Sequence, residues 1–105
     1  MPDTDTIQYG PILVSGATGQ VRRQGYPVHL TPIEYRLLCY LLCNQGRILP
    51  RDELLSAVWN FPPGTATRTL DIHIASLRKK LGLQQAIKTV NKKGYLLYPE
   101  SERTS

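Results

Sequence analysis

The stretch 67–81 constrains the fold most, because it predicts a single amphipathic helix with a defined start, buried face and end. Its apolar residues recur at i, i+4, i+7 and i+11, which is the spacing of one buried stripe on an α-helix. These residues are Leu70, Ile74, Leu77 and Leu81. Thr67 can cap the start, since its hydroxyl can accept an N–H of the first turn. Gly82 follows the last apolar residue, where a left-handed cap needs no Cβ.

The opposite face of this helix is basic around a small apolar centre. At about 100° per residue, the residues that point away from the stripe are Arg68, Ile72, Ala75, Ser76 and Lys79, with Thr69, His73, Arg78 and Lys80 on the flanks. Such a face suits a helix in the major groove of DNA, where cations meet phosphates and short side chains approach base edges or thymine methyls. A solvated face with one exposed isoleucine explains the same pattern, and on this helix alone both interpretations stay open.

The formal net charge of +5 is concentrated in one segment of the 105 residues. Residues 1–67 are neutral overall, residues 68–93 carry seven basic residues against one acid, and residues 94–105 carry a net charge of −1. A local excess of this kind favours a polyanionic partner.

The length fits one domain. No apolar run approaches the roughly 18 residues of a membrane span, so we expect no membrane partner.

Cys39 and Cys43 are the only cysteines, and both fall on a predicted helix. Their i, i+4 spacing can present two ligands to a metal ion, but no third or fourth ligand is close in sequence. We therefore interpret them as small thiols on or beside a helix core, with no metal site and no cofactor. Two thiols without a disulfide framework agree with a reducing, cytoplasmic location.

The other elements follow from local signals along the chain. Short apolar runs separated by turn residues predict a four-stranded antiparallel meander at 7–9, 12–14, 20–22 and 28–30. Thr31, Pro32 and Glu34 form a capping box that begins a helix, which ends near Gly46. A very short strand is expected at 47–49, and a second helix near Pro50.

The segment 60–66 contains two prolines and a glycine, which cannot continue a helix, so we expect a loop there between the second helix and the basic helix. Two final strands are predicted at 87–90 and 95–98, joined by a cationic hairpin tip at 91–94. The predicted fold is α+β, a winged helix-turn-helix with an N-terminal four-stranded sheet, three helices and a C-terminal hairpin wing. It spans 7–98, and the polar ends at 1–6 and 99–105 are expected to be disordered.

Several segments resemble the OmpR/PhoB effector domain, and together they cover residues 7–98 in register. The segments are Leu30–Leu38, Gly46–Leu49, Leu54–Trp59, Arg68–Ile74, Leu77–Leu81 and Gly94–Tyr95. The resemblance implies sequence-specific binding of double-stranded DNA by the output domain of a bacterial two-component response regulator. It also implies binding to direct repeats, contact with RNA polymerase through the 60–66 loop, and an isolated domain that is monomeric off DNA.

The resemblance assigns roles to individual residues. Trp59, Arg68, Thr69, His73 and Arg78 approach phosphates, Ile72 and Ser76 face bases, and Thr89 holds the backbone near the wing. Lys79, Lys80, Asn91, Lys92 and Lys93 complete the predicted DNA-binding set. Simpler interpretations remain open for three of these residues: Trp59 as a cover for its helix core, His73 as a surface residue beside Asp71, and Thr89 as a good β-former.

The sequence departs from the family pattern at three places. Ala75 and Ser76 stand where members often carry basic residues, and Asn91-Lys92 stands where an arginine and a glycine are common. The first two departures weaken base readout more than attraction to the DNA backbone. Pro50 replaces the usual capping Ser or Thr. The acidic cluster of a phosphorylated receiver domain is absent from these 105 residues, so we expect either an output domain excised from a longer protein or a protein that works without phosphorylation.

Two other classes of function remain to be weighed. A winged-helix protein-interaction module with weak or non-specific DNA binding is the alternative, supported by the missing base-reading side chains. An enzyme is not expected, because the sequence offers no paired carboxylates, phosphate-binding loop or nucleophile–base–acid set. Asp71 and His73 resemble part of a triad, but they lie about 200° apart around the helix and do not face one another. We therefore expect no catalytic residue.

Overall fold

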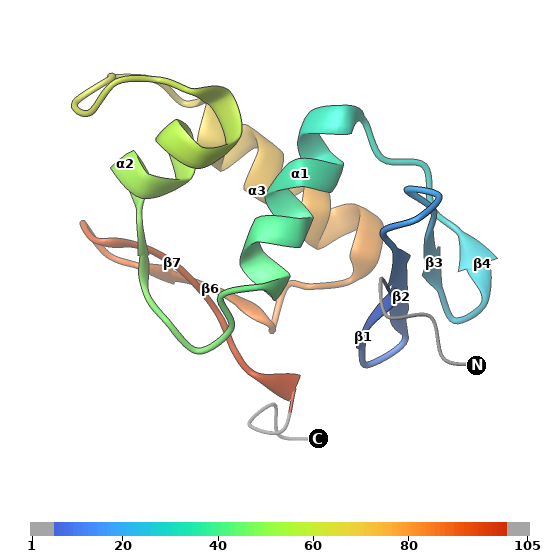
Figure 1. The fold of residues 1–105 in the computed structure, drawn as a ribbon. Helices are drawn as coiled ribbons and strands as arrows, with labels where there is room; N and C mark the ends of the chain where they lie inside the picture. Colours follow the sequence, from blue (N-terminus) through green and yellow to red (C-terminus); the bar gives the residue numbers. More distant parts are fainter. Residues whose placement is uncertain (1–5, 101–105) are drawn as a thin grey trace.

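The computed structural model describes residues 6–100, and its elements confirm the predicted winged-helix fold (Figure 1). Their order is β1 (Thr6–Tyr9), β2 (Ile12–Ser15), β3 (Val21–Arg23), β4 (Tyr26–Pro27), α1 (Pro32–Leu42), β5 (Leu49–Pro50), α2 (Arg51–Leu54), η1 (Leu55–Trp59), α3 (Thr69–Leu81), β6 (Ile87–Val90) and β7 (Gly94–Leu97). The helices lie between the N-terminal sheet and the β6–β7 hairpin (Figure 1). Within the described residues, no helix has the length and apolar character needed to cross a membrane.

The N-terminal sheet is the predicted antiparallel meander, in the order β1-β2-β3-β4. Strand β4 lies at Tyr26–Pro27, so the strand predicted at 28–30 was placed two residues late at its start and three residues late at its end. The reason is the tight turn after β3, where Gln24 and Gly25 adopt positive φ and the chain pairs back at once. Strand β1 begins at Thr6, one residue before the predicted start, because Thr6 pairs with Ser15 of β2.

The predicted disordered ends fall almost wholly on residues 1–5 and 101–105, which lie outside the described residues. Glu100 is described, and its carboxylate accepts a hydrogen bond of 2.8 Å from the backbone N–H of Gly10. This contact joins the end of the hairpin segment to the β1–β2 turn. Glu100 thus contacts the sheet, and the disorder expected for 99–105 stays a prediction.

Helix α1 begins with the predicted capping box. The Thr31 hydroxyl accepts from the N–H of Glu34, and the Glu34 carboxylate accepts from the N–H of Thr31. The helix buries Leu37, Leu38, Leu41 and Leu42. Together with apolar residues of both sheets and α3, these leucines form one continuous core, in which α1 packs against η1, α3 and β7.

The second helix differs from a regular α-helix. It begins at Arg51 with no side-chain cap at Pro50, and after one turn it continues as the π-helical segment η1. Leu55 and Val58 stay buried, while Trp59 is half-buried at the edge of the core. Asn60 ends the segment in the left-handed conformation, with φ of 62°. A π turn inside a helix is set by packing, which a periodic pattern does not reveal.

The second sheet has the order β5-β7-β6, so the short strand β5 joins the wing hairpin to the helices. Strand β5 lies at Leu49–Pro50 where 47–49 was predicted, and β7 begins at Gly94, one residue early. Pro50 pairs directly with Gly94. A Cβ at position 94 would stand 1.9 Å from the carbonyl oxygen of Leu49, so only glycine permits this approach.

Candidate nucleic-acid interface

Helix α3 has the predicted buried stripe and the predicted glycine cap. Leu70, Ile74, Leu77 and Leu81 are all buried, and Gly82 is left-handed with φ of 66°. The start differs by one residue: Arg68 is the N-cap and makes no side-chain cap. The Thr67 hydroxyl instead accepts a hydrogen bond of 3.1 Å from the N–H of Thr69, so it serves the first turn from one position further out.

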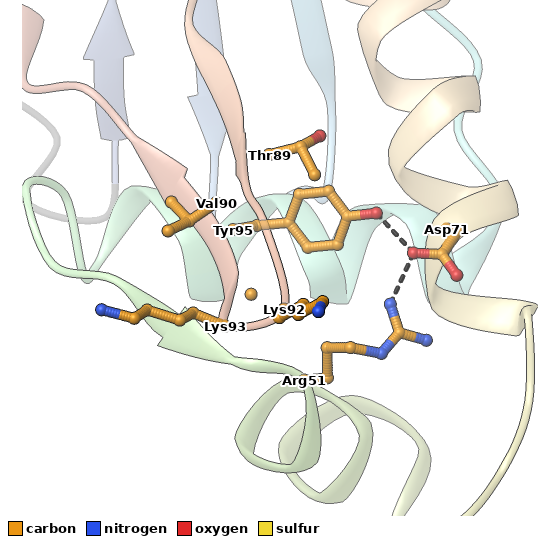
Figure 2. Close-up of a pocket in the computed structure, with 8 residues that line it drawn as sticks. Arg51, Asp71, Thr89, Val90, Lys92, Lys93 and Tyr95 are labelled. Atoms are coloured by element: carbon orange, nitrogen blue, oxygen red, sulfur yellow. Dashed lines mark hydrogen bonds and ion pairs between the residues drawn. The ribbon is translucent and has the colours of Figure 1, made fainter.

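A chain of polar contacts holds the start of α3 against α2 and the wing (Figure 2). The Arg51 guanidinium donates to the Asp71 carboxylate at 2.6 Å and to the carbonyl of Thr67 at 3.1 Å. The buried Tyr95 of β7 donates its hydroxyl to the same carboxylate oxygen of Asp71. Arg51 lowers the pKa of Asp71 below its usual range, so this carboxylate is charged at neutral pH. Burial, and then the Asp71 charge, raise the pKa of Tyr95 to about 12.

This contact closes one side of a small pocket of about 80 Å³ between α3 and the wing. The hairpin tip supplies Lys92 and Lys93 to its rim, and both lysines are exposed. Figure 2 shows Arg51, Asp71 and Tyr95 meeting between the helix and the hairpin, with Lys93 extending away from them. Because Arg51 is paired with Asp71, the excess positive charge at this edge comes from the two lysines, and it attracts an anion.

Arg78 ties the middle of α3 to the first strand of the wing. Its guanidinium donates to the carbonyl of Ile87 at 2.6 Å and 3.2 Å, and to the hydroxyl of Thr89 at 2.9 Å. It also lies 5.8 Å from the centre of the Tyr95 ring, within the range of a cation–π contact. With Asp71, Arg78 fixes the orientation of α3 relative to the hairpin.

Trp59 and His73 lie together where η1 meets α3. Their ring centroids are 5.1 Å apart with an edge-on geometry, and Nδ1 of His73 is 2.8 Å from the carbonyl of Thr69. Both side chains are half-buried, and Trp59 also packs on the core. Trp59 thus packs on the core, as one of its two interpretations expects, while its contact with DNA stays a prediction.

Glu34 draws two of the predicted DNA-binding residues toward α1. Only 5% of Glu34 is exposed, and its carboxylate accepts from the Ser76 hydroxyl and from the Lys80 ammonium at 2.7 Å. Lys80 also donates to the carbonyl of His29 at 3.3 Å. Burial raises the pKa of Glu34, but the hydrogen bonds from Lys80, Ser76 and Thr31 outweigh it and lower the pKa to about 2.

The predicted residues thus fall into groups. Arg68, Ile72 and Lys79 are exposed on one face of α3, together with Ala75. Thr89, Asn91, Lys92 and Lys93 are exposed on the wing. Thr69, His73, Ser76, Arg78, Lys80 and Trp59 are half-buried and bound to other parts of the protein. Sequence reasoning missed Arg51 and Tyr95, because their contacts with Asp71 join residues 20 or more positions apart.

Comparison with known proteins places this geometry in a family. The family model described as "Transcriptional regulatory protein, C terminal" matches residues 21–97. The chain belongs to this family. It is an OmpR/PhoB-type winged-helix domain of transcription regulators, as the sequence resemblance implies.

Relatives and solved structures agree with this assignment. The OmpR/PhoB-type domain is 42% identical over 96 residues to the transcriptional regulatory protein CseB of Streptomyces avermitilis, covering 91% of this chain and 40% of CseB. It superposes with a TM-score of 0.81 on the Klebsiella pneumoniae RstA DNA-binding domain, solved in complex with the RstA box, at 35% identity over 90% of this chain and 97% of that one. The effector domain of BfmR from Acinetobacter baumannii gives a TM-score of 0.78 at 29% identity, covering 99% of both chains. The chain spans about 40% of the length of the curated relatives that it matches.

Proposed function

We propose that this domain binds double-stranded DNA as the output domain of a bacterial two-component response regulator, with the exposed face of α3 in the major groove and the wing tip beside the adjacent backbone. The RstA domain, which carries the same fold at 35% identity, has been solved with its DNA box. Arg68 and Lys79 of α3 and the two lysines of the wing tip are exposed, and contacts of Arg78 and Asp71 join the helix to the hairpin. A helix with an adjacent basic hairpin matches the known docking of winged-helix proteins.

The bridge made by Arg78 carries this proposal. Because one guanidinium holds both Ile87 and Thr89 of β6, the helix and the wing form one preorganised surface. Preorganisation lowers the entropy cost of meeting a rigid duplex at two places. Arg78 and Thr89 then act chiefly by holding this surface together, beyond any phosphate contact that they make.

The exposed cations divide between the two elements. Arg68 and Lys79 stand at the two ends of the α3 face and meet phosphates on either side of the groove. Thr69, Trp59 and His73 add contacts near the start of the helix. At the wing, Asn91, Lys92 and Lys93 contact the DNA backbone or the minor groove. Arg51 lines the same pocket as the two lysines.

The remaining partners follow the same proposal. The loop at 60–66 offers exposed Pro62 and Pro63 to RNA polymerase, and internal hydrogen bonds of Thr65 to Pro62 hold its shape. The domain is monomeric off DNA, binds direct repeats, and works in the cytoplasm, where the bacterial chromosome lies. Replacing Pro62 and Pro63 by alanine should then reduce transcription from a target promoter while leaving DNA affinity unchanged.

The proposal is tested by selecting binders from a random duplex pool and measuring Arg68→Ala against wild type on the winners. Each phosphate contact contributes about 0.9 to the slope of log affinity against log salt. Arg68→Ala should weaken binding, flatten this slope by about that amount and leave thermal stability unchanged, since Arg68 is exposed. Arg36→Ala is the matched control, because Arg36 is an exposed arginine on α1 outside the proposed interface.

Two results would contradict the proposal. Equal affinity of Arg68→Ala and wild type would remove α3 from the groove. Absence of salt-sensitive duplex binding at low salt would favour the alternative, a protein-interaction module on a winged-helix scaffold. Salt-sensitive binding without enrichment of any sequence would restrict the domain to backbone attraction.

A further inference from the structure

The exposed positions of α3 form one narrow row with an apolar centre. Arg68, Ile72, Ala75 and Lys79 are the positions from 68 to 81 that are exposed, and their spacing of four, three and four residues places them on a single face. Ile72 is 63% exposed, although isoleucine is among the most often buried residue types. The two cations stand at the ends of the row, and the two apolar side chains stand between them.

The polar side chains next to this centre are already engaged within the protein. Ser76 donates to Glu34, and Lys80 contacts Glu34 and His29. On the other flank Asp71 is bound by Arg51 and Tyr95. A base edge facing the middle of α3 therefore meets methyl and methylene groups, with no free bidentate donor pair at positions 71 to 76 among the described side chains.

We infer that the domain reads its DNA site through contact of Ile72 and Ala75 with the 5-methyl groups of thymines in the major groove. This inference rests on the proposed function and specifies the DNA that the domain binds, which is a site with thymines facing the middle of α3. Thymine is the standard base that presents a methyl group in the major groove, and small apolar side chains are the groups that contact it. Positions 72 and 75 are about 4.5 Å apart along the helix axis, close to the rise of one base-pair step, so two neighbouring pairs are within reach.

An exposed isoleucine also occurs on surfaces that bind proteins, so the position of the row matters. Ile72 lies between Arg68 and Lys79 on a helix whose segment carries the chain's excess positive charge. An apolar strip with cations at both ends fits a groove floor with phosphate walls better than it fits an apolar protein surface. The charge pattern thus favours DNA as the occupant of this face.

The test compares duplexes that differ only in the thymine methyl. The site selected from the random pool is prepared with thymine and with deoxyuridine at each position in turn, which removes the methyl and keeps the base pairing. Each contacted methyl should change wild-type affinity by about fourfold, the equivalent of about 0.8 kcal/mol for one buried carbon. Ile72→Ala should bind the thymine duplex more weakly and lose the sensitivity to deoxyuridine at one position.

Arg68→Ala is the matched control, because it removes a neighbouring exposed side chain of different chemistry. It should bind both duplexes more weakly while keeping the wild-type ratio between thymine and deoxyuridine. Ile72→Val, which retains part of the contact, should fall between wild type and Ile72→Ala. Circular dichroism checks that each variant is folded.

Equal wild-type affinity for all thymine and deoxyuridine duplexes would overturn the inference while leaving DNA binding intact. So would a deoxyuridine effect of the same size in Ile72→Ala and wild type at every position, or a selected site without thymine in its core. Absence of duplex binding in the wild type at low salt would instead overturn the proposed function. The two failures are therefore distinguishable.

Discussion

Replacing Glu34 by glutamine tests whether a buried charge holds α3 on α1. The wild-type carboxylate is 5% exposed and accepts hydrogen bonds from Ser76, Lys80 and the backbone of Thr31. Glutamine keeps the shape but removes the charge, so the ammonium of Lys80 loses its ion pair. The NH2 of the glutamine amide would also replace either the oxygen that accepts from Lys80 and Thr31 or the oxygen that accepts from Ser76, so at least one donor loses its acceptor.

The size of the effect follows from the pKa of Glu34, which the fold lowers from 4.5 to about 2. A lowering of this size corresponds to about 3 kcal/mol of stability at neutral pH. Because the folded pKa lies below the unfolded one, this stability is fully present above pH 4.5 and is lost as the pH falls toward 2. At pH 3, between the two pKa values, the same relation leaves less than half of this stability.

The assay is urea unfolding of wild type and Glu34→Gln at pH 7 and pH 3. We expect a difference in unfolding free energy of about 3 kcal/mol at pH 7 that shrinks by more than half at pH 3. Glu53→Gln is the comparison variant. The pKa of Glu53 is also lowered to about 2, by hydrogen bonds from Arg47 and Tyr40. Both members of its ion pair are more exposed than Lys80 and Glu34, so solvent screening should make the loss of stability smaller than in Glu34→Gln. Equal stability of Glu34→Gln and wild type at pH 7, or a difference that does not shrink at pH 3, would refute the electrostatic explanation.

Three further variants test the wing and its contact with α3. Lys92 has φ of +62°, so Lys92→Gly should raise the unfolding free energy by about 0.5–1 kcal/mol while weakening DNA binding; thermal unfolding measures the first effect. Lys93→Gly, at a position without positive φ, should instead lose stability, and equal shifts in both variants would contradict the conformational explanation. Arg78→Lys keeps the charge but loses the planar fork, so it should destabilise the domain by about 1–2 kcal/mol in urea; full stability with lysine would show that charge alone suffices.

Local signals predicted most of the fold. The capping box at Thr31 and Glu34, the leucine stripe of α3 and the hairpin at 87–98 each depend on residues within about one helical turn or one hairpin. These interactions are close in sequence, so their spacing is visible there. The strand ends were wrong by one to three residues, because a tight turn or a neighbouring strand sets them.

The parts that could not be predicted depend on distant contacts. The Arg51–Asp71–Tyr95 contact joins three elements, and no period in the sequence relates them. A helical wheel places Ser76 on the outer face of α3, but the carboxylate of Glu34, 42 residues away in sequence, binds its hydroxyl. The wheel describes the helix alone, whereas the accessible face depends on what packs beside it.

This division of the α3 surface makes a prediction about restoring base-reading arginines. At position 76 an arginine would lie beside the buried carboxylate of Glu34, which already binds Ser76 and Lys80, and the ion pair would hold its guanidinium away from the bases. At the exposed position 75 an arginine would remain free to make a bidentate contact with guanine, worth about 1–3 kcal/mol of discrimination. Selection from a random duplex pool should therefore enrich a new guanine for Ala75→Arg and none for Ser76→Arg. Guanine enrichment by Ser76→Arg would show that Glu34 does not control which side chains of α3 reach the groove.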